Sequence, residues 1–141
     1  MDGFGIKPSV KNKRIYISRN KAKIRKIINE KEFFSMLKKY NFEKVYAEDL
    51  SYKEQVETFN SANITVSVFG AGFSNLIFSD NCKVLEIYPP NKIRTHYFML
   101  SKALGLEYYY VIGYDLKENV NFKVDVKKAE IIIQKMIKTQ I

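Results

Sequence analysis

Along the chain, short strand-like runs of apolar residues alternate with segments in which apolar residues recur at helical spacing. Five short runs rich in β-branched and aromatic residues predict strands, and segments with apolar positions every three or four residues predict helices. Ser51 and Glu54 have the spacing of a capping box at a helix start. The predicted strands cover residues 14–18, 43–48, 63–69, 83–88 and 107–113, and the predicted helices residues 30–40, 51–62, 73–78, 95–104 and 125–140.

Strands and helices alternate, and the strands are almost continuously apolar. This combination is typical of a parallel sheet covered by helices on both of its faces. The sequence therefore predicts an α/β, Rossmann-like fold with a mostly parallel sheet. Residues 1–13 show no period and are expected to form a tail or linker stub, whereas residues 14–141 are expected to form one domain.

Composition narrows the class of protein. The 141 residues are 46% hydrophobic and 28% charged, which excludes a disordered or collagen-like chain. The single cysteine, Cys82, cannot build a disulfide framework, and no apolar run reaches the length of a membrane span. The first residues also lack the basic and apolar regions of a signal peptide. We therefore expect a soluble, cytoplasmic protein without a membrane span.

The net charge of +9 is concentrated near the N-terminus. Residues 1–29 contain nine lysines and arginines and one acid, Asp2. Such a segment fits nucleic acid, an anionic membrane surface or a phosphate ligand, and also fits a general lysine bias in the composition.

Ligands of parallel sheets bind beyond the carboxyl ends of the strands. After the first predicted strand comes a basic loop with Arg19 and Arg25, two of only four arginines in a chain with twenty lysines. Arginine binds phosphate bidentately, so the loop is a candidate phosphate site, although a solvated surface loop explains it equally well. After the second strand, Glu48 could hold a sugar or ribose hydroxyl or favour the next helix start.

The third predicted strand leads into a turn that contains two of the six glycines, followed by a short helix. Glycines and free helix-start amides suit a phosphate, but a tight turn explains them as well. Because Asn75 replaces the last glycine of the dinucleotide fingerprint, an NAD site is disfavoured. His96 and Cys82 lack neighbouring ligand residues, so we expect no metal site, and the aromatic residues are assigned mainly to the core. The glycine-containing turn after the third predicted strand consists of Phe69, Gly70, Ala71, Gly72, Phe73, Ser74 and Asn75.

Taken in order, these motifs resemble the C-terminal half of the catalytic region in glycosyltransferase family 61, over about residues 14–89. The resemblance implies the GT-B architecture and transfer of a sugar from a nucleotide donor, UDP-linked, to a glycan or other acceptor, with inversion and without a metal or cofactor. Bacterial members are often tied to capsular polysaccharide biosynthesis. The implied donor-binding residues are Arg19, Arg25, Gly70, Ala71, Gly72, Ser74, Asn75 and Glu86, with Glu48 or Glu86 supporting the ribose or sugar.

Two departures from the family pattern limit what the resemblance implies. Phe69 stands where the family has a histidine, and the N-terminal domain of a GT-B enzyme is expected to be missing or to be supplied by a partner chain. The catalytic base is therefore unassigned, and whether the isolated chain is active stays open. Two alternatives remain: a degenerate, non-catalytic interaction module of the same fold and, ranked third, a basic nucleic-acid-binding domain. Because no helix concentrates the basic charge, nucleic acid is not the expected partner.

Overall fold

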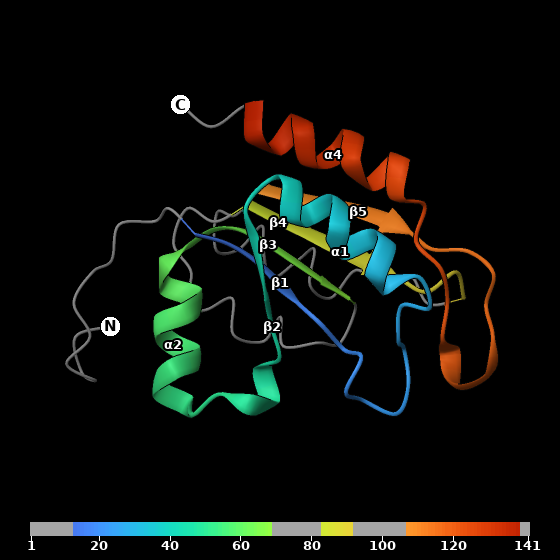
Figure 1. Cartoon of the computed structure of the whole chain (residues 1–141), viewed down its shortest axis with the longest axis horizontal. Coiled ribbons are helices and arrows are strands. Elements are labelled where there is room, and N and C mark those ends of the chain that lie inside the picture. The colour runs from blue at the N-terminus through green and yellow to red at the C-terminus, as the bar shows by residue number, and fades with distance from the viewer. Residues whose placement is uncertain (1–12, 69–82, 92–106, 139–141) are drawn as a thin grey trace.

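A computed structural model describes residues 13–68, 83–91 and 107–138 of the chain. Within these ranges, five strands form one sheet in the order β2-β1-β3-β4-β5, and every neighbouring pair is parallel. The arrowheads of β1, β3 and β5 in Figure 1 accordingly point towards the same end of the sheet. The predicted α/β, Rossmann-like fold is confirmed. The strands are β1 (Lys13–Ile17), β2 (Phe42–Val45), β3 (Ala62–Val68), β4 (Lys83–Tyr88) and β5 (Glu107–Ile112).

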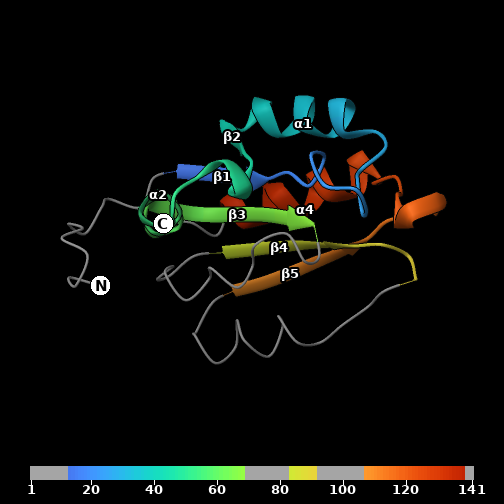
Figure 2. The same cartoon turned by 90° about the horizontal axis from the view of Figure 1, so that it is seen from below.

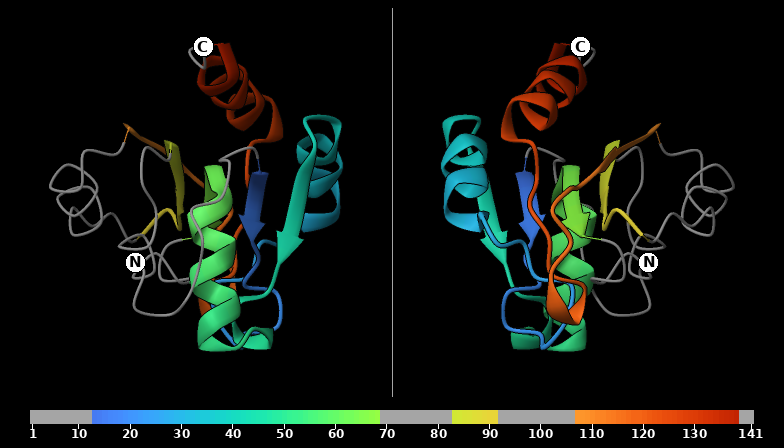
Figure 3. Two further views of the ribbon diagram at one scale, coloured as in Figure 1. Left: turned by 90° about the vertical axis from the view of Figure 1, so that its left-hand side faces the viewer. Right: turned by 90° about the vertical axis from the view of Figure 1, so that its right-hand side faces the viewer.

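Three α-helices accompany the sheet in the described part of the chain: α1 (Glu30–Lys39), α2 (Tyr52–Ser61) and α4 (Val126–Lys138). The chain passes outwards from β1 to β2 and then returns across β1 to β3. Because such connections are right-handed, α1 and α2 cover opposite faces of the sheet. Helix α4 lies beside α1, whereas α2 lies apart from both (Figures 1 and 3).

Most predicted elements agree with the observed ones to within one or two residues. The capping box is confirmed: the Ser51 Oγ accepts a hydrogen bond from the Glu54 amide at 3.1 Å, and the Ser51 amide donates to the Glu54 carboxylate at 2.9 Å. The helices predicted at 73–78 and 95–104 lie outside the described residues.

The second predicted strand was too long. It was expected over residues 43–48, but β2 ends at Val45, and a short 3₁₀ helix, η2 (Ala47–Asp49), follows. Strand β2 is one of the two edge strands of the sheet, and Val45 pairs with Ile17, the last residue of β1. Beyond Val45 the backbone therefore has no strand to pair with, and it forms local hydrogen bonds instead, such as that from the Asp49 amide to the Tyr46 carbonyl at 3.0 Å.

The core lies on both faces of the central strands. In β1, the ring of Tyr16 meets Phe33 of α1 edge-on with centroids 5.4 Å apart, while Ile15 and Ile17 point to the opposite face. All four side chains are buried. Because the side chains of β1 are buried on both faces of the sheet, packing holds this strand in place. The loop that follows β1 therefore begins at a well-packed position.

Candidate functional site

Strands β1 and β3 are neighbours, but their following connections lead in opposite directions, from β1 to β2 and from β3 to β4. In a doubly wound sheet, ligands bind in the crevice at such a switch point, outside the carboxyl ends of the strands. Residues 18–29 follow β1 at this end of the sheet, beyond the arrowhead of β1 in Figure 2. The predicted turn from Phe69 to Asn75 starts directly after Val68, the end of β3, but lies outside the described residues.

The side chain of Asn20 closes the basic loop on itself. Its Nδ2 donates to the Ile27 carbonyl at 3.2 Å, and its Oδ1 accepts from the Ile27 amide at 3.1 Å. The Asn20 amide in turn donates to the Ser18 Oγ at 3.1 Å. Arg19 and Arg25 therefore belong to a loop whose two ends are joined by hydrogen bonds.

A segment from the last third of the chain supports the same loop. The Arg25 amide donates to the Asn119 carbonyl at 3.0 Å, and the Lys26 amide donates to the Asn121 Oδ1 at 2.9 Å. Ile27 and Phe122 form a parallel β-bridge. Asn119 belongs to the 3₁₀ helix η4 (Glu118–Val120), which lies beside the loop in Figure 1. These contacts hold Arg25 at a φ of 60°, a conformation that is uncommon for a residue other than glycine.

The structure brings three of the predicted site residues together: Arg19, Arg25 and Glu48. Partial burial of Arg19 lowers its pKa, the positive charge of Arg25 lowers it further, and the negative charge of Glu48 acts in the opposite direction. The Arg19 Nε also donates to the Ile24 carbonyl at 3.3 Å. Two guanidinium groups thus share the loop, with an exposed carboxylate on η2 near them.

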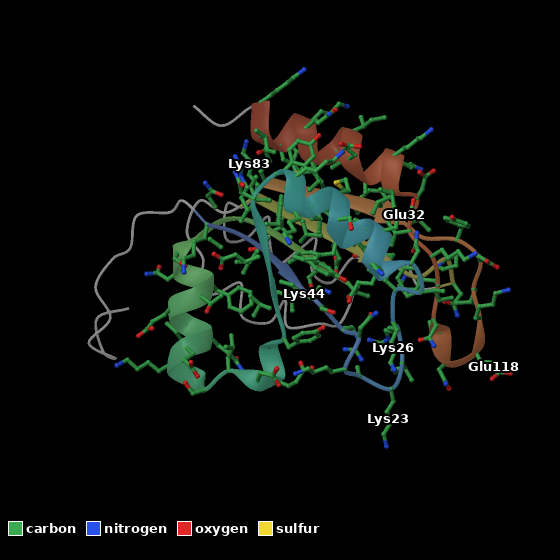
Figure 4. The ribbon with its side chains drawn as sticks, viewed as in Figure 1. Lys23, Lys26, Glu32, Lys44, Lys83 and Glu118 are labelled. Atoms are coloured by element: carbon green, nitrogen blue, oxygen red, sulfur yellow. The ribbon has the colours of Figure 1, made fainter. Side chains whose placement is uncertain are left out.

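Lysines of the loop differ in their surroundings. Lys21 forms an ion pair with Asp49, and its Nζ lies 4.5 Å from the centroid of the Tyr46 ring, so it ties the loop to η2. Lys23 is exposed, and its side chain points from the loop away from the sheet in Figure 4. Lys23 therefore shares the loop with the arginines without being held against η2.

Glu86, the predicted strand-end glutamate, is fully buried in β4. Its Oε1 accepts hydrogen bonds from the hydroxyl groups of Tyr88 and Tyr108, both at 2.6 Å, and the two hydroxyl oxygens lie 2.8 Å apart. Burial raises the pKa of the Glu86 carboxyl, although the two tyrosine hydrogen bonds act in the opposite direction. The other oxygen, Oε2, has no hydrogen-bond partner in the described part of the chain. A role of Glu86 towards a ribose or sugar stays a prediction.

A second buried carboxylate was not predicted as a functional residue. Glu30, the first residue of α1, accepts hydrogen bonds from the Tyr16 hydroxyl at 2.8 Å and the Ser18 hydroxyl at 2.5 Å, and pairs with the Lys44 Nζ at 3.0 Å. It joins the end of β1 to the start of α1 and so fixes where the loop between them begins. A glutamate in the first helical turn is usually explained by the helix dipole, so no sequence pattern indicates this network.

Some predicted features lie outside the described residues: Gly70, Ala71, Gly72, Ser74 and Asn75, together with Phe69, Cys82 and His96. Within the described ranges, no three His, Cys, Asp or Glu side chains are grouped so that they could hold a metal ion. None of the helices in those ranges has both the length and the apolar character needed to cross a membrane.

The parallel sheet with an arginine-bearing loop at its switch point defines an α/β protein of the Rossmann-like class. Residues 2–85 match the family model described as Glycosyltransferase 61. Because this match covers more than half of the chain, the protein belongs to that family. A comparison with curated proteins found no significant match.

Proposed function

We propose that the chain binds the diphosphate of a nucleotide sugar, UDP-linked, between the carboxyl ends of β1 and β3, as the donor-binding half of a GT-B glycosyltransferase. The observation that carries the proposal is that Arg19 and Arg25 lie in one braced loop at the switch point, where the charge of Arg19 interacts with those of Arg25 and Glu48. Two guanidinium groups held close together repel each other, and an anion between them removes that repulsion.

The chemistry of sugar transfer suits such a loop. As the bond between the sugar and the diphosphate breaks, negative charge develops on the leaving diphosphate. Fixed positive groups stabilise that charge, and they act most strongly when they need not reorganise during the reaction. Arg19 and Arg25 would bind the diphosphate oxygens, and the turn from Gly70 to Asn75 would contribute backbone amides. Glu48 or Glu86 would support the ribose or the sugar.

The acceptor would be a glycan, and the biological setting would be the synthesis of a surface or capsular polysaccharide. Both rest on membership of the family and on the resemblance of the ordered motifs. The catalytic base is not assigned to any residue of this chain.

Calorimetric titration of the full chain with UDP and UDP-sugars tests the donor site. Arg19→Ala and Arg25→Ala should each weaken UDP binding by about tenfold or more, since a charge-assisted hydrogen bond is worth roughly 1.5–3 kcal/mol. Lys23→Ala is the matched control, because it removes the same charge from the same loop, and it should change the affinity by less than about threefold.

Failure to bind UDP or any other nucleoside diphosphate at millimolar concentration would overturn the proposal. Equal losses in all three variants would also contradict it, because they would indicate attraction by the total charge of the loop rather than contact with the two arginines.

A further inference from the structure

An open cavity of about 450 Å³ lies between α1, the edge strand β2 and two residues of the basic loop, Asn20 and Ile28. Its volume falls within the range of small-molecule sites. Helix α1 contributes Lys31, Phe34, Ser35 and Lys38 to the wall, and β2 contributes Lys44. The cavity lies on the sheet face that α1 covers, near the edge of the sheet, and Arg19 and Arg25 are not part of its lining.

The lining carries more positive than negative charge. Lys31 and Lys38 are seven residues apart on α1, so both side chains lie on the same side of the helix. Neither forms an ion pair with a described residue, whereas Lys44 pairs with Glu30, which also lines the cavity. The lining thus contains three lysines and one glutamate, and that glutamate is already bound by Tyr16, Ser18 and Lys44.

Lys44 is the fixed cation of the cavity. Its Nζ lies 3.0 Å from the Glu30 Oε1 and 4.7 Å from the centroid of the Phe34 ring, and Phe34 stacks on Tyr16 with centroids 6.2 Å apart. Figure 4 shows Lys44 beside β2 and below α1. Only one of the three ammonium protons is needed for the bond to Glu30, so Lys44 can donate others to a ligand. Its position is set before a ligand arrives, which lowers the entropic cost of binding.

We propose that this cavity binds the phosphate group of a small phosphate ester about the size of a sugar phosphate. The three lysines and one glutamate of the lining have a net charge of +2, which matches a phosphate dianion. Lysines bind phosphate as point charges. The volume exceeds what one phosphate group fills and leaves room for the remainder of the ester. The lysines that bind the anion come from α1 and β2, whereas the basic loop adds only Asn20 and Ile28 to the wall, so this site differs from the proposed donor site in its cationic residues.

The test uses glucose 6-phosphate as probe and titration calorimetry on the full chain, with unphosphorylated glucose for comparison. The double variant Lys31→Gln/Lys38→Gln is preferred to a change at Lys44, because both lysines are exposed and the buried Glu30 keeps its partner. The matched control is Lys127→Gln/Lys128→Gln, which removes two exposed charges from α4.

We expect one site for glucose 6-phosphate, weakened about tenfold or more in the α1 double variant and less than about threefold in the α4 control. Glucose itself should not bind. Equal losses in both double variants, equal binding of glucose, or no binding at millimolar concentration would each overturn the proposal. Loss with Arg19→Ala but not with the α1 variant would place the probe at the switch point and would likewise exclude this cavity.

Discussion

Glu86 shows how a single ionisable group can oppose folding at neutral pH. Its carboxyl is fully buried beside the hydroxyl groups of Tyr88 and Tyr108, and burial raises its pKa above the ordinary glutamate value of 4.5. The folded protein therefore binds this proton more tightly than the unfolded chain does. The contribution to the free energy of unfolding is fully present below the ordinary pKa and is lost as the pH rises through the raised one.

Replacing Glu86 by glutamine should remove this pH dependence. The amide oxygen can still accept hydrogen bonds from both tyrosines, and no charge forms in the core. As the pH rises above the ordinary glutamate pKa of 4.5, the free energy of unfolding should fall less steeply for Glu86→Gln than for the wild type in urea denaturation. Glu118→Gln, an exposed acid, should follow the wild-type curve. Parallel curves for Glu86→Gln and the wild type would contradict the assignment.

For single residues, the sequence predicted that Glu86 lies near the end of a strand, but it did not predict the hydrogen-bond partners of Glu86. Tyr88 lies two positions after Glu86 in the same strand, so strand alternation alone places both on one face. Tyr108 reaches the same carboxylate only because β5 pairs with β4 in a register that matches Val84 to Tyr108. That register depends on packing across the sheet and cannot be read from either strand alone.

Among the elements, α2 is specified most locally. Its capping box needs only Ser51 and Glu54, which are three positions apart, and so the sequence was sufficient to predict its start. The basic loop is the opposite case. The Lys26 amide donates a hydrogen bond to Asn121, which lies 95 positions further along the chain, and no local sequence pattern predicts that contact. The end of β2 was likewise missed, because it depends on where the neighbouring strand β1 ends.

Removing the cap should destabilise the protein by a predictable amount. Ser51→Ala deletes the oxygen that accepts from the Glu54 amide, and we expect the free energy of unfolding to fall by about 1 kcal/mol. Ser51→Asn retains a side-chain oxygen suited to this position and should stay within about 0.5 kcal/mol of the wild type. Chemical denaturation of the three proteins measures both values, and equal stabilities for alanine and serine would show that the box contributes nothing.

For the molecule as a whole, the connection between β5 and α4 joins distant parts of the fold. Gly113 follows β5 directly, and a Cβ at this position would lie 2.2 Å from the Phe122 Cδ2 and 2.7 Å from the Lys123 carbonyl oxygen. Phe122 is buried and bridges to Ile27 in the basic loop. Glycine at position 113 thus permits the close approach that brings residues 114–124 against the loop.

Gly113→Ala should therefore affect stability and nucleotide binding together. Overpacking against a buried ring and a backbone carbonyl costs roughly 1–3 kcal/mol, and displacement of Phe122 should loosen the segment that contacts Arg25. We expect a lower free energy of unfolding in denaturation and weaker UDP binding in calorimetry. Leu116→Ala, an exposed change in the same connection, should alter stability by less than about 0.5 kcal/mol. Unchanged UDP affinity in a destabilised Gly113→Ala would contradict the link between this connection and the loop.

The contacts between the basic loop and residues 119–124 also determine how much of the chain must be transferred to move the loop into another protein. The stretch that matches the family ends at residue 85, inside β4, whereas the partners of Arg25, Lys26 and Ile27 come from beyond β5. A graft of the family stretch alone into a related protein would divide a strand and leave the arginine loop without its support. A chimera meant to carry the basic loop in its folded form must therefore include β5 and the connection to α4 in the transferred segment.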